Sequence, residues 1–203
     1  MSDRRPLSAV VLAGGRSSRF GRDKLAESID GRSLLDRAVD AVRLLATEVL
    51  VVAGPGSALA IREGARLVHD PEPFEGPLAG TVAGLAVATG ERVLVVGGDM
   101  PLLVAAVLES MARELDDPAI DACVLVHDGR VRPLPMAVRR GPAMAAARTL
   151  LDGGERRLRA LLDALETRSI PEEAWRRLDP LADTLRDIDT PADLDIDTPA
   201  DLG

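Results

Sequence analysis

Short apolar runs that alternate with helix-like segments constrain the fold of this chain more than any other feature. Runs of Val, Leu and Ala occupy 9–14 and 48–54, and a third begins the stretch 92–101. Such continuous apolar runs are typical of parallel strands that are buried on both faces. The helix-like segments between and after them span 33–46, 76–90 and 101–115. This alternation predicts a single α/β domain, a three-layer sandwich around a mostly parallel central sheet.

Local signals mark where two of these helices begin and end. Ser33, followed three residues later by Asp36, resembles a capping box and starts the 33–46 helix. Gly90 is the expected stop of the 76–90 helix, which is built from small residues.

The second half of the chain predicts a hairpin and then helices. The segments 121–129 and 131–140 are strand-like and meet at Asp128-Gly129, a dipeptide typical of a tight hairpin turn. An antiparallel hairpin makes the predicted sheet mixed. Residues 142–178 are expected to be mostly helical.

Composition limits the possible partners. The chain has 203 residues, a formal charge of −8, two Phe, one Trp and no Tyr. A nucleic-acid surface is basic and often carries aromatic stacking platforms, so nucleic acid is not an expected partner.

Cysteine usage predicts a reducing compartment, and hydropathy predicts a chain without an export signal or a membrane helix. The single Cys123 cannot form an internal disulfide, and two His residues offer no Cys/His metal cluster. The apolar run 9–13 behind twin arginines is too short for an export signal, and no run approaches the ~20 apolar residues of a membrane helix. We therefore expect a cytoplasmic protein without a membrane segment.

The stretch VVLAGGRSSRFGRDK, 10–24, concentrates positive charge behind a glycine turn. A strand that ends in Gly14-Gly15 can expose consecutive N–H groups to an anion, and Arg19 and Lys24 can reach phosphate oxygens. A turn followed by a solvated basic segment is the alternative, but the density of Arg and Ser favours anion binding. The spacing matches neither a dinucleotide-binding fingerprint nor a P-loop.

Two carboxylates follow predicted strands, Asp99 an apolar strand and Asp70 a short one. Asp99 lies at the end of the 92–101 run, where open α/β sheets place their ligands, and it could bind Mg²⁺ together with phosphates. It could equally cap a helix that begins at Pro101. Asp70 begins a Gly/Pro-rich loop within 68–80 that could approach a flat ligand, although an ordinary turn is the simpler interpretation from spacing alone.

Arginine is concentrated in 130–159. Eight arginines face only two acidic residues there, which gives +6 in a chain of −8. A solvated face is the usual reason for such a run, but this concentration indicates a second ligand with its own phosphate.

The chain ends in a tandem repeat. DIDTPADL occurs at 187–194 and again at 195–202, too short and too few for a solenoid. We assign 1–194 to the domain and 195–203 to a duplicated tail.

The motif LAGGRSSRFGRDK resembles the L-A-G-G-x-S-x-R-x-G-x-D-K signature of the molybdenum cofactor guanylyltransferases. That family belongs to the nucleotidyltransferase superfamily, whose Rossmann-like fold is of the glycosyltransferase-A kind. Later blocks are similar in the same order, so the resemblance covers nearly the whole chain. These blocks read EGPLAG, GGDMP, VHDGR, PLPMAV, GGERRL and DIDTPADL.

The resemblance implies a role for particular residues. The nucleotide would be lined by the backbone of Leu12, Ala13, Gly14 and Gly15 and by Asp70. Catalysis would rest on Lys24 and Arg19 at the phosphates and on Asp99, which would bind both the nucleotide and Mg²⁺. Arg156 and Arg157 would face the molybdopterin acceptor. Two departures stand out: the strand 48–54 ends in Ala53-Gly54 where the family often has Asn, and Asp187 and Asp189 stand where it often has N-x-N.

The implied reaction transfers GMP from GTP to the phosphate of molybdopterin and releases pyrophosphate. The same chemistry with CTP, transfer to a sugar phosphate or another metabolite, and a regulator that binds nucleotide without catalysis are the alternatives. The cytidylyl branch tends to read L-A-A-G at 12–15, which favours guanine here. We expect a monomer that could touch other molybdenum cofactor biosynthesis proteins transiently.

Overall fold

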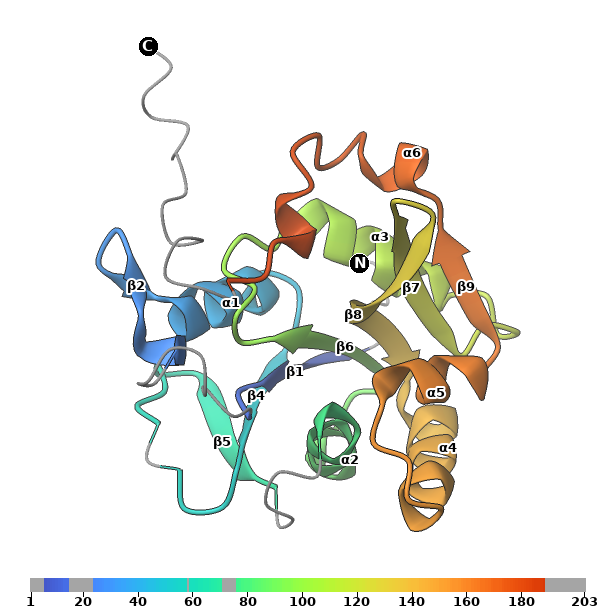
Figure 1. Ribbon diagram of the computed structural model, residues 1–203, viewed down its shortest axis with the longest axis horizontal. Coiled ribbons are helices and arrows are strands. Elements are labelled where there is room, and N and C mark those ends of the chain that lie inside the picture. Colours follow the sequence, from blue (N-terminus) through green and yellow to red (C-terminus); the bar gives the residue numbers. More distant parts are fainter. Residues whose placement is uncertain (1–5, 15–23, 58, 71–75, 189–203) are drawn as a thin grey trace.

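The computed structural model describes residues 6–14, 24–57, 59–70 and 76–188, and its centre is a seven-stranded sheet. The strand order across the sheet is β5-β4-β1-β6-β8-β7-β9 (Figure 1). Its strands are β1 (Leu7–Leu12), β4 (Glu48–Ala53), β5 (Ala65–His69), β6 (Arg92–Gly97), β7 (Ala122–His127), β8 (Arg130–Arg139) and β9 (Thr167–Ile170). A separate two-stranded ribbon joins β2 (Ser28–Ile29) to β3 (Arg32–Ser33).

One strand makes the sheet mixed. β1 pairs in parallel with β4 and with β6, β4 pairs in parallel with β5, and β7 pairs in parallel with β9. β8 alone in this sheet is antiparallel to both of its neighbours, β6 and β7. The predicted hairpin is therefore confirmed, and Asp128 and Gly129 form its turn with positive φ angles of 49° and 68°.

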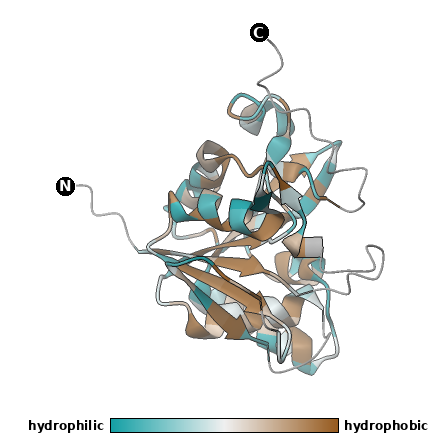
Figure 2. Cartoon of the chain, turned by 90° about the vertical axis from the view of Figure 1, so that its left-hand side faces the viewer, coloured by the Kyte–Doolittle hydropathy of each residue, from teal (hydrophilic) through white to brown (hydrophobic). Residues whose placement is uncertain are grey.

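Helices cover both faces of the sheet. Residues of α1 and α3 pack on one face, and residues of α2, α4 and α5 pack on the other, so the predicted three-layer sandwich is confirmed (Figure 1). Figure 2 shows apolar residues along the strands between the helical layers. The helices are α1 (Leu34–Arg43), α2 (Pro77–Val87), α3 (Ala105–Glu114), α4 (Arg140–Asp152), α5 (Leu158–Asp163) and α6 (Glu172–Trp175), with 3-10 turns η1 (Lys24–Ala26) and η2 (Asp183–Leu185).

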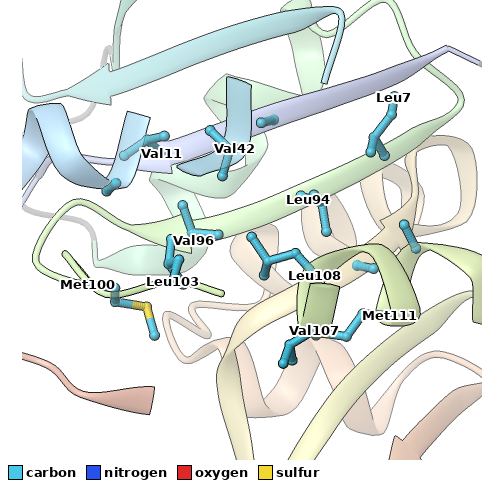
Figure 3. Close-up of a cluster of buried hydrophobic side chains, with 14 of the residues drawn as sticks. Leu7, Val11, Val42, Leu94, Val96, Met100, Leu103, Val107, Leu108 and Met111 are labelled. Carbon is cyan, nitrogen blue, oxygen red and sulfur yellow. The ribbon is translucent and has the colours of Figure 1, made fainter. Parts of the chain in front are cut away.

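The period of two along each strand divides the core into two clusters. Ala9 and Val11 of β1 face α1 and α3, whereas Val10 faces α2. The same alternation places Leu94 and Val96 of β6 in the first cluster, against α3 (Figure 3). Burial of β1 and β6 on both faces explains why their sequences are continuous in apolar residues.

Small residues in α2 let that helix lie close to the sheet. A Cβ on Gly84 would come within 2.6 Å of the Val10 side chain, and one on Gly80 would lie 3.4 Å from Leu12 Cδ2. The two glycines are four residues apart and therefore share the face that packs on β1 and β4. The small-residue composition of this helix is thus a packing requirement.

Several predicted boundaries were wrong. α3 begins at Ala105 rather than at Pro101, because residues 101–104 form a turn and an extended stretch before Val104 caps the helix. α2 ends before Ala88, and Gly90 instead packs against Ser8, whose Oγ accepts its N–H at 2.9 Å. The stretch 142–178 is mostly helical, as predicted, but it also contains β9, a half-buried edge strand without a continuous apolar run.

The start of α1 agrees with prediction. Ser33 is its N-cap, and its Oγ accepts the Asp36 N–H at 3.0 Å. In the part of the chain that the structure describes, no helix combines the length and apolar character needed to span a bilayer.

Candidate active site at the carboxyl edge of the sheet

The sheet reverses its winding at β1. The chain leaves β1, passes over one face through α1 to β4, and later returns over the other face through α2 to β6, on the opposite side of β1. Loops that leave such a strand diverge to opposite faces and open a crevice at its carboxyl end. The candidate residues at the ends of β1, β5 and β6 all belong to this edge.

Backbone hydrogen bonds continue past the strand ends and hold this edge together. Ala13 N–H donates to Val52 O at 2.7 Å, and Gly98 N–H donates to Leu12 O at 2.9 Å. Asp70 N–H donates to Ala53 O at 2.8 Å. The residues just after each strand are therefore fixed relative to one another.

The first half of the predicted nucleotide loop lies at the centre of the edge. The Leu12 side chain packs into the α2 layer, so only its backbone can face the edge. Gly14 is exposed, and a Cβ there would meet Gly54 N at 4.0 Å. Gly15 and Arg19 lie outside the described residues, and their predicted roles stay predictions.

Lys24 begins η1, which brings the end of the nucleotide loop back to the same edge. Its neighbour Leu25 packs at Gly98, where a Cβ would meet Leu25 Cδ2 at 3.4 Å and Leu12 O at 3.2 Å. Gly98 is thus the close-approach point between the turn after β6 and the segment that carries Lys24. The sequence could not reveal this contact, because it joins residues 73 positions apart.

Asp99 is half-buried just beyond β6. Its carboxylate folds back over the end of the strand, since Oδ1 lies only 2.5 Å from the position of a Cβ on Gly97. Any side chain at Gly97 would displace this carboxylate. Because α3 begins at Ala105, Asp99 does not cap that helix, and the capping alternative is wrong.

Asp70 is half-buried at the end of β5, on the other side of β1 from Asp99. Three strand spacings separate β5 from β6, which corresponds to about 14 Å at ~4.8 Å per strand. The two carboxylates therefore flank the ends of β4 and β1 and do not share one cation.

Arg156 and Arg157 follow α4, and their surroundings differ. The Arg156 guanidinium donates to the carbonyl oxygens of Leu151 and Glu155, at 3.1 and 2.9 Å, and the residue is half-buried. Arg157 is exposed and pairs with Glu155 at 2.7 Å. Hydrogen bonds from the Arg157 guanidinium and from the N–H groups of Arg157 and Arg156 lower the pKa of Glu155 to about 2.

The Arg156 backbone also contacts the start of α2. Leu78 N–H donates to Arg156 O, and a Cβ on Gly76 would lie 3.2 Å from that oxygen. The proposed acceptor segment is therefore packed against the start of α2, the next helix in the chain after Asp70.

The remaining arginines of 130–159 do not gather at one place. Arg130 begins β8 near the carboxyl edge, whereas Arg139 ends β8 beside Arg92, at the opposite edge of the sheet. The Arg139 guanidinium donates to three backbone carbonyl oxygens, those of Leu115, Asp117 and Ile120. Part of the local positive charge thus holds loops together and does not form one anion site.

A cluster that the sequence did not suggest joins the β7–β8 hairpin to α6. Glu172 accepts from His127 Nδ1 at 3.0 Å, from the Asp128 N–H at 2.8 Å and from Arg176 at 3.2 Å. The ligand atoms of His127, Asp128 and Glu172 lie within 4.8 Å of one another. Both Glu172 oxygens already accept hydrogen bonds, and the Arg176 cation lies beside them. We therefore interpret the cluster as a structural contact that holds the β7–β8 hairpin against α6.

The fold, with Asp70 and Asp99 at the carboxyl edge of its sheet, is consistent with a nucleoside-triphosphate transferase domain. Residues 9–169 match the family model described as the MobA-like NTP transferase domain. The chain belongs to this family.

Relatives agree over nearly the full length. The probable molybdenum cofactor guanylyltransferase of Chloroflexus aggregans is 38% identical over 192 residues, covering 93% of this chain and 91% of that protein. The molybdenum cofactor guanylyltransferase of Xanthomonas euvesicatoria pv. vesicatoria is 36% identical over 181 residues, covering 87% and 89%.

Solved structures support the same fold. Molybdopterin-guanine dinucleotide biosynthesis protein A of Archaeoglobus fulgidus superposes with a TM-score of 0.79 at 25% identity, covering 92% of this chain and 94% of that one. The 4-diphosphocytidyl-2C-methyl-D-erythritol synthase of Anaerococcus prevotii superposes with a TM-score of 0.70 at 16% identity, covering 95% and 96%, which shows the fold alone.

Proposed function

We propose that this protein transfers GMP from GTP to the phosphate of molybdopterin and releases pyrophosphate. The observation that carries the proposal is the position of Ala13–Gly14, Asp70 and Asp99 along one edge, at the winding reversal of the sheet. Relatives that are named molybdenum cofactor guanylyltransferases over nine-tenths of the chain support the choice of nucleotide and acceptor. No covalent nucleophile is required, because the acceptor phosphate attacks the α-phosphorus directly.

The residues divide the work by position. Backbone N–H groups of the loop after β1 and the side chains of Arg19 and Lys24 would neutralise the triphosphate, and Asp70 would contact the nucleoside. Arg156 and Arg157 would hold the acceptor on the other side of Gly76. Catalysis is then alignment of two phosphates together with neutralisation of the charge on the departing pyrophosphate.

Asp99 suits a magnesium site better than any other described carboxylate of this edge. It is half-buried just beyond β6, and hydrogen bonds fix its backbone on both sides: Gly98 N–H donates to Leu12 O, and Ile188 N–H donates to Asp99 O. Mg²⁺ takes one or two protein carboxylates together with phosphates and water, and Asp99 would supply one of them. When bound, the ion would supply charge stabilisation at the phosphates.

Incubation with nucleotide, Mg²⁺ and molybdopterin tests the proposal directly. Parallel reactions with GTP, CTP, ATP and UTP, each with and without molybdopterin, should form a dinucleotide cofactor and pyrophosphate with GTP only. Preference for CTP would establish the cytidylyl alternative. Nucleotide binding without any turnover would favour the regulator. We further propose that the protein works as a cytoplasmic monomer, which sedimentation at micromolar concentration would check.

A further inference from the structure

The chain from η2 to the last described residue, drawn red in Figure 1, reaches the turn that carries Asp99 through a backbone hydrogen bond. We call residues 184–188 the C-terminal strap. Its Thr184 Oγ1 accepts the Val104 N–H at 3.2 Å, and its Ile188 N–H donates to Asp99 O at 3.1 Å. The strap therefore forms a hydrogen bond with each end of the connection between β6 and α3.

The strap is itself anchored. The buried carboxylate of Asp179 accepts the N–H groups of Asp183 and Thr184 at 3.0 and 2.8 Å and so fixes the turn that begins the strap. Leu185 is 7% exposed and belongs to the core cluster beneath α3. A segment held in this way can support the Asp99 turn, which has little regular structure of its own.

Ile188 connects this support to the segment that follows Lys24. Its side chain is 1% exposed and packs with Ile29 of β2 and Leu34, the first residue of α1. We call residues 24–34 the lysine-bearing arm. Ile188 therefore contacts the proposed cation turn through its backbone and, through its side chain, Ile29 and Leu34 of this arm.

We propose that Ile188 is a positioning residue that fixes the spacing between the Asp99 carboxylate and the arm that carries Lys24. The proposal rests on the proposed function, because it assumes that Asp99 binds the divalent cation. Groups that orient a metal ligand without touching the metal typically change metal affinity about 10- to 100-fold when they are removed. Loss of the Ile188 side chain should therefore weaken cation binding while the nucleotide loop keeps its own affinity.

The test uses the full chain with Ile188→Ala and Ile196→Ala combined, because an identical Ile occupies the second repeat. Mn²⁺ binding is measured by electron paramagnetic resonance in the presence of a non-hydrolysable GTP analogue. Affinity of the same analogue without divalent cation is measured by calorimetry. We expect Mn²⁺ affinity to fall roughly 10-fold or more. The affinity for the nucleotide analogue without divalent cation should stay unchanged, and kcat should fall by a larger factor than KM changes.

Controls separate positioning from general destabilisation. Leu115→Ala empties a fully buried site at the distal end of α3 and should leave Mn²⁺ affinity intact despite a similar loss of stability. The pair Ile188→Val and Ile196→Val should restore most of the affinity. If the alanine pair does not fold, Thr184→Val removes the other strap contact and should lower Mn²⁺ affinity in the same direction.

The outcomes are distinguishable from failure of the proposed function. Asp99→Asn is measured alongside. If Asp99→Asn abolishes Mn²⁺ binding while the strap variants bind it normally, the positioning role is overturned and the cation assignment stands. If Asp99→Asn also binds Mn²⁺ normally, the cation assignment falls and the positioning role falls with it.

Discussion

The carbonyl oxygen of Arg156 lies 3.2 Å from the position that a Cβ would occupy on Gly76. Gly76 also has a φ of +89°, which L side chains rarely adopt. The contact joins the N-cap of α2 to the segment that we propose to hold the acceptor.

Gly76→Ala should therefore destabilise the fold and shift the Arg156 segment. Strain at the positive φ is worth roughly 1–3 kcal/mol, and the overlap with Arg156 adds to it. Gly31→Ala is a control for a positive φ in open space, because Gly31 has a φ of +74° and a Cβ added to it would meet nothing within 4 Å, whereas Gly76 combines its φ with a ψ of 177°, a region that essentially only glycine adopts. Chemical denaturation of both variants measures the difference; equal losses would mean that the Arg156 contact carries no energy.

Asp99→Asn should reduce GMP transfer roughly 100-fold or more while the protein stays folded. The amide keeps the size of the carboxylate and its place over Gly97 but removes the charge that the cation needs. Initial rates over a range of Mg²⁺ concentrations, with circular dichroism as the check on folding, test this. Mg²⁺-dependent activity near the wild-type level would place the cation elsewhere.

Lys24→Ala should weaken GTP binding more than GMP binding. Lys24 is proposed to touch the outer phosphates, which GMP lacks, and a charge-assisted hydrogen bond of this kind is worth about 1.5–3 kcal/mol. Titration calorimetry with both nucleotides decides the point. An equal loss for the two would show that Lys24 does not act at the β- and γ-phosphates.

Replacing Arg156 and Arg157 by Ala should spare GTP binding and raise the KM for the pterin acceptor. Arg148→Ala is a suitable control, because Arg148 is an exposed arginine on α4. Its replacement changes the net charge but leaves the segment of Arg156 and Arg157 unaltered. Since the Arg156 guanidinium also binds two carbonyl oxygens, Arg156→Lys should be measured to separate charge from loop support. A drop in GTP affinity with unchanged acceptor use would reverse the assignment of the two sides.

Elements that are buried on both faces were predictable from the sequence. β1, β4 and β6 consist of continuous apolar residues because each strand lies between two helical layers. β9 was missed because it is a half-buried edge strand, and the start of α3 was misplaced because Pro101 suggested a first helical turn. Residues 101–104 stay outside the helix beside Thr184, a partner 80 positions from Val104 that no local pattern indicates.

The candidate site divides in the same way. The placement of Asp70 and Asp99 on one edge was predictable, because each follows a predicted strand of a mostly parallel sheet. Their roles stay predictions, since spacing alone favoured an ordinary turn at Asp70 and did not decide between a helix cap and a metal ligand at Asp99. The supports of that edge, such as Leu25 against Gly98 and Ile188 on Asp99, were not predictable. They are tertiary contacts between segments whose own sequences are ordinary.

The two copies of the tandem repeat should differ in what they contribute to the fold. The first copy supplies Ile188, which is buried against Ile29 and Leu34, and Asp187, whose carboxylate lies 3.7 Å from the Arg132 guanidinium. Because Ile188 already fills the position against Ile29 and Leu34, the copy at 195–202 should be dispensable. Truncation after Leu194 should leave the melting temperature and GMP transfer almost unchanged, as calorimetry and a rate assay would measure.

Identical copies also allow exchange of register, in which the second copy occupies the groove of the first. Ile188→Ala alone distinguishes the two arrangements. If only the first copy can dock, that single substitution should cost about 2–5 kcal/mol, the range for a large aliphatic residue truncated in a core. If the copies exchange, Ile188→Ala should cost little in the full chain and the full amount after truncation at Leu194. A large loss of stability on deleting 195–203 from the otherwise unchanged chain would contradict the assignment, because it would mean that the second copy holds the docked position.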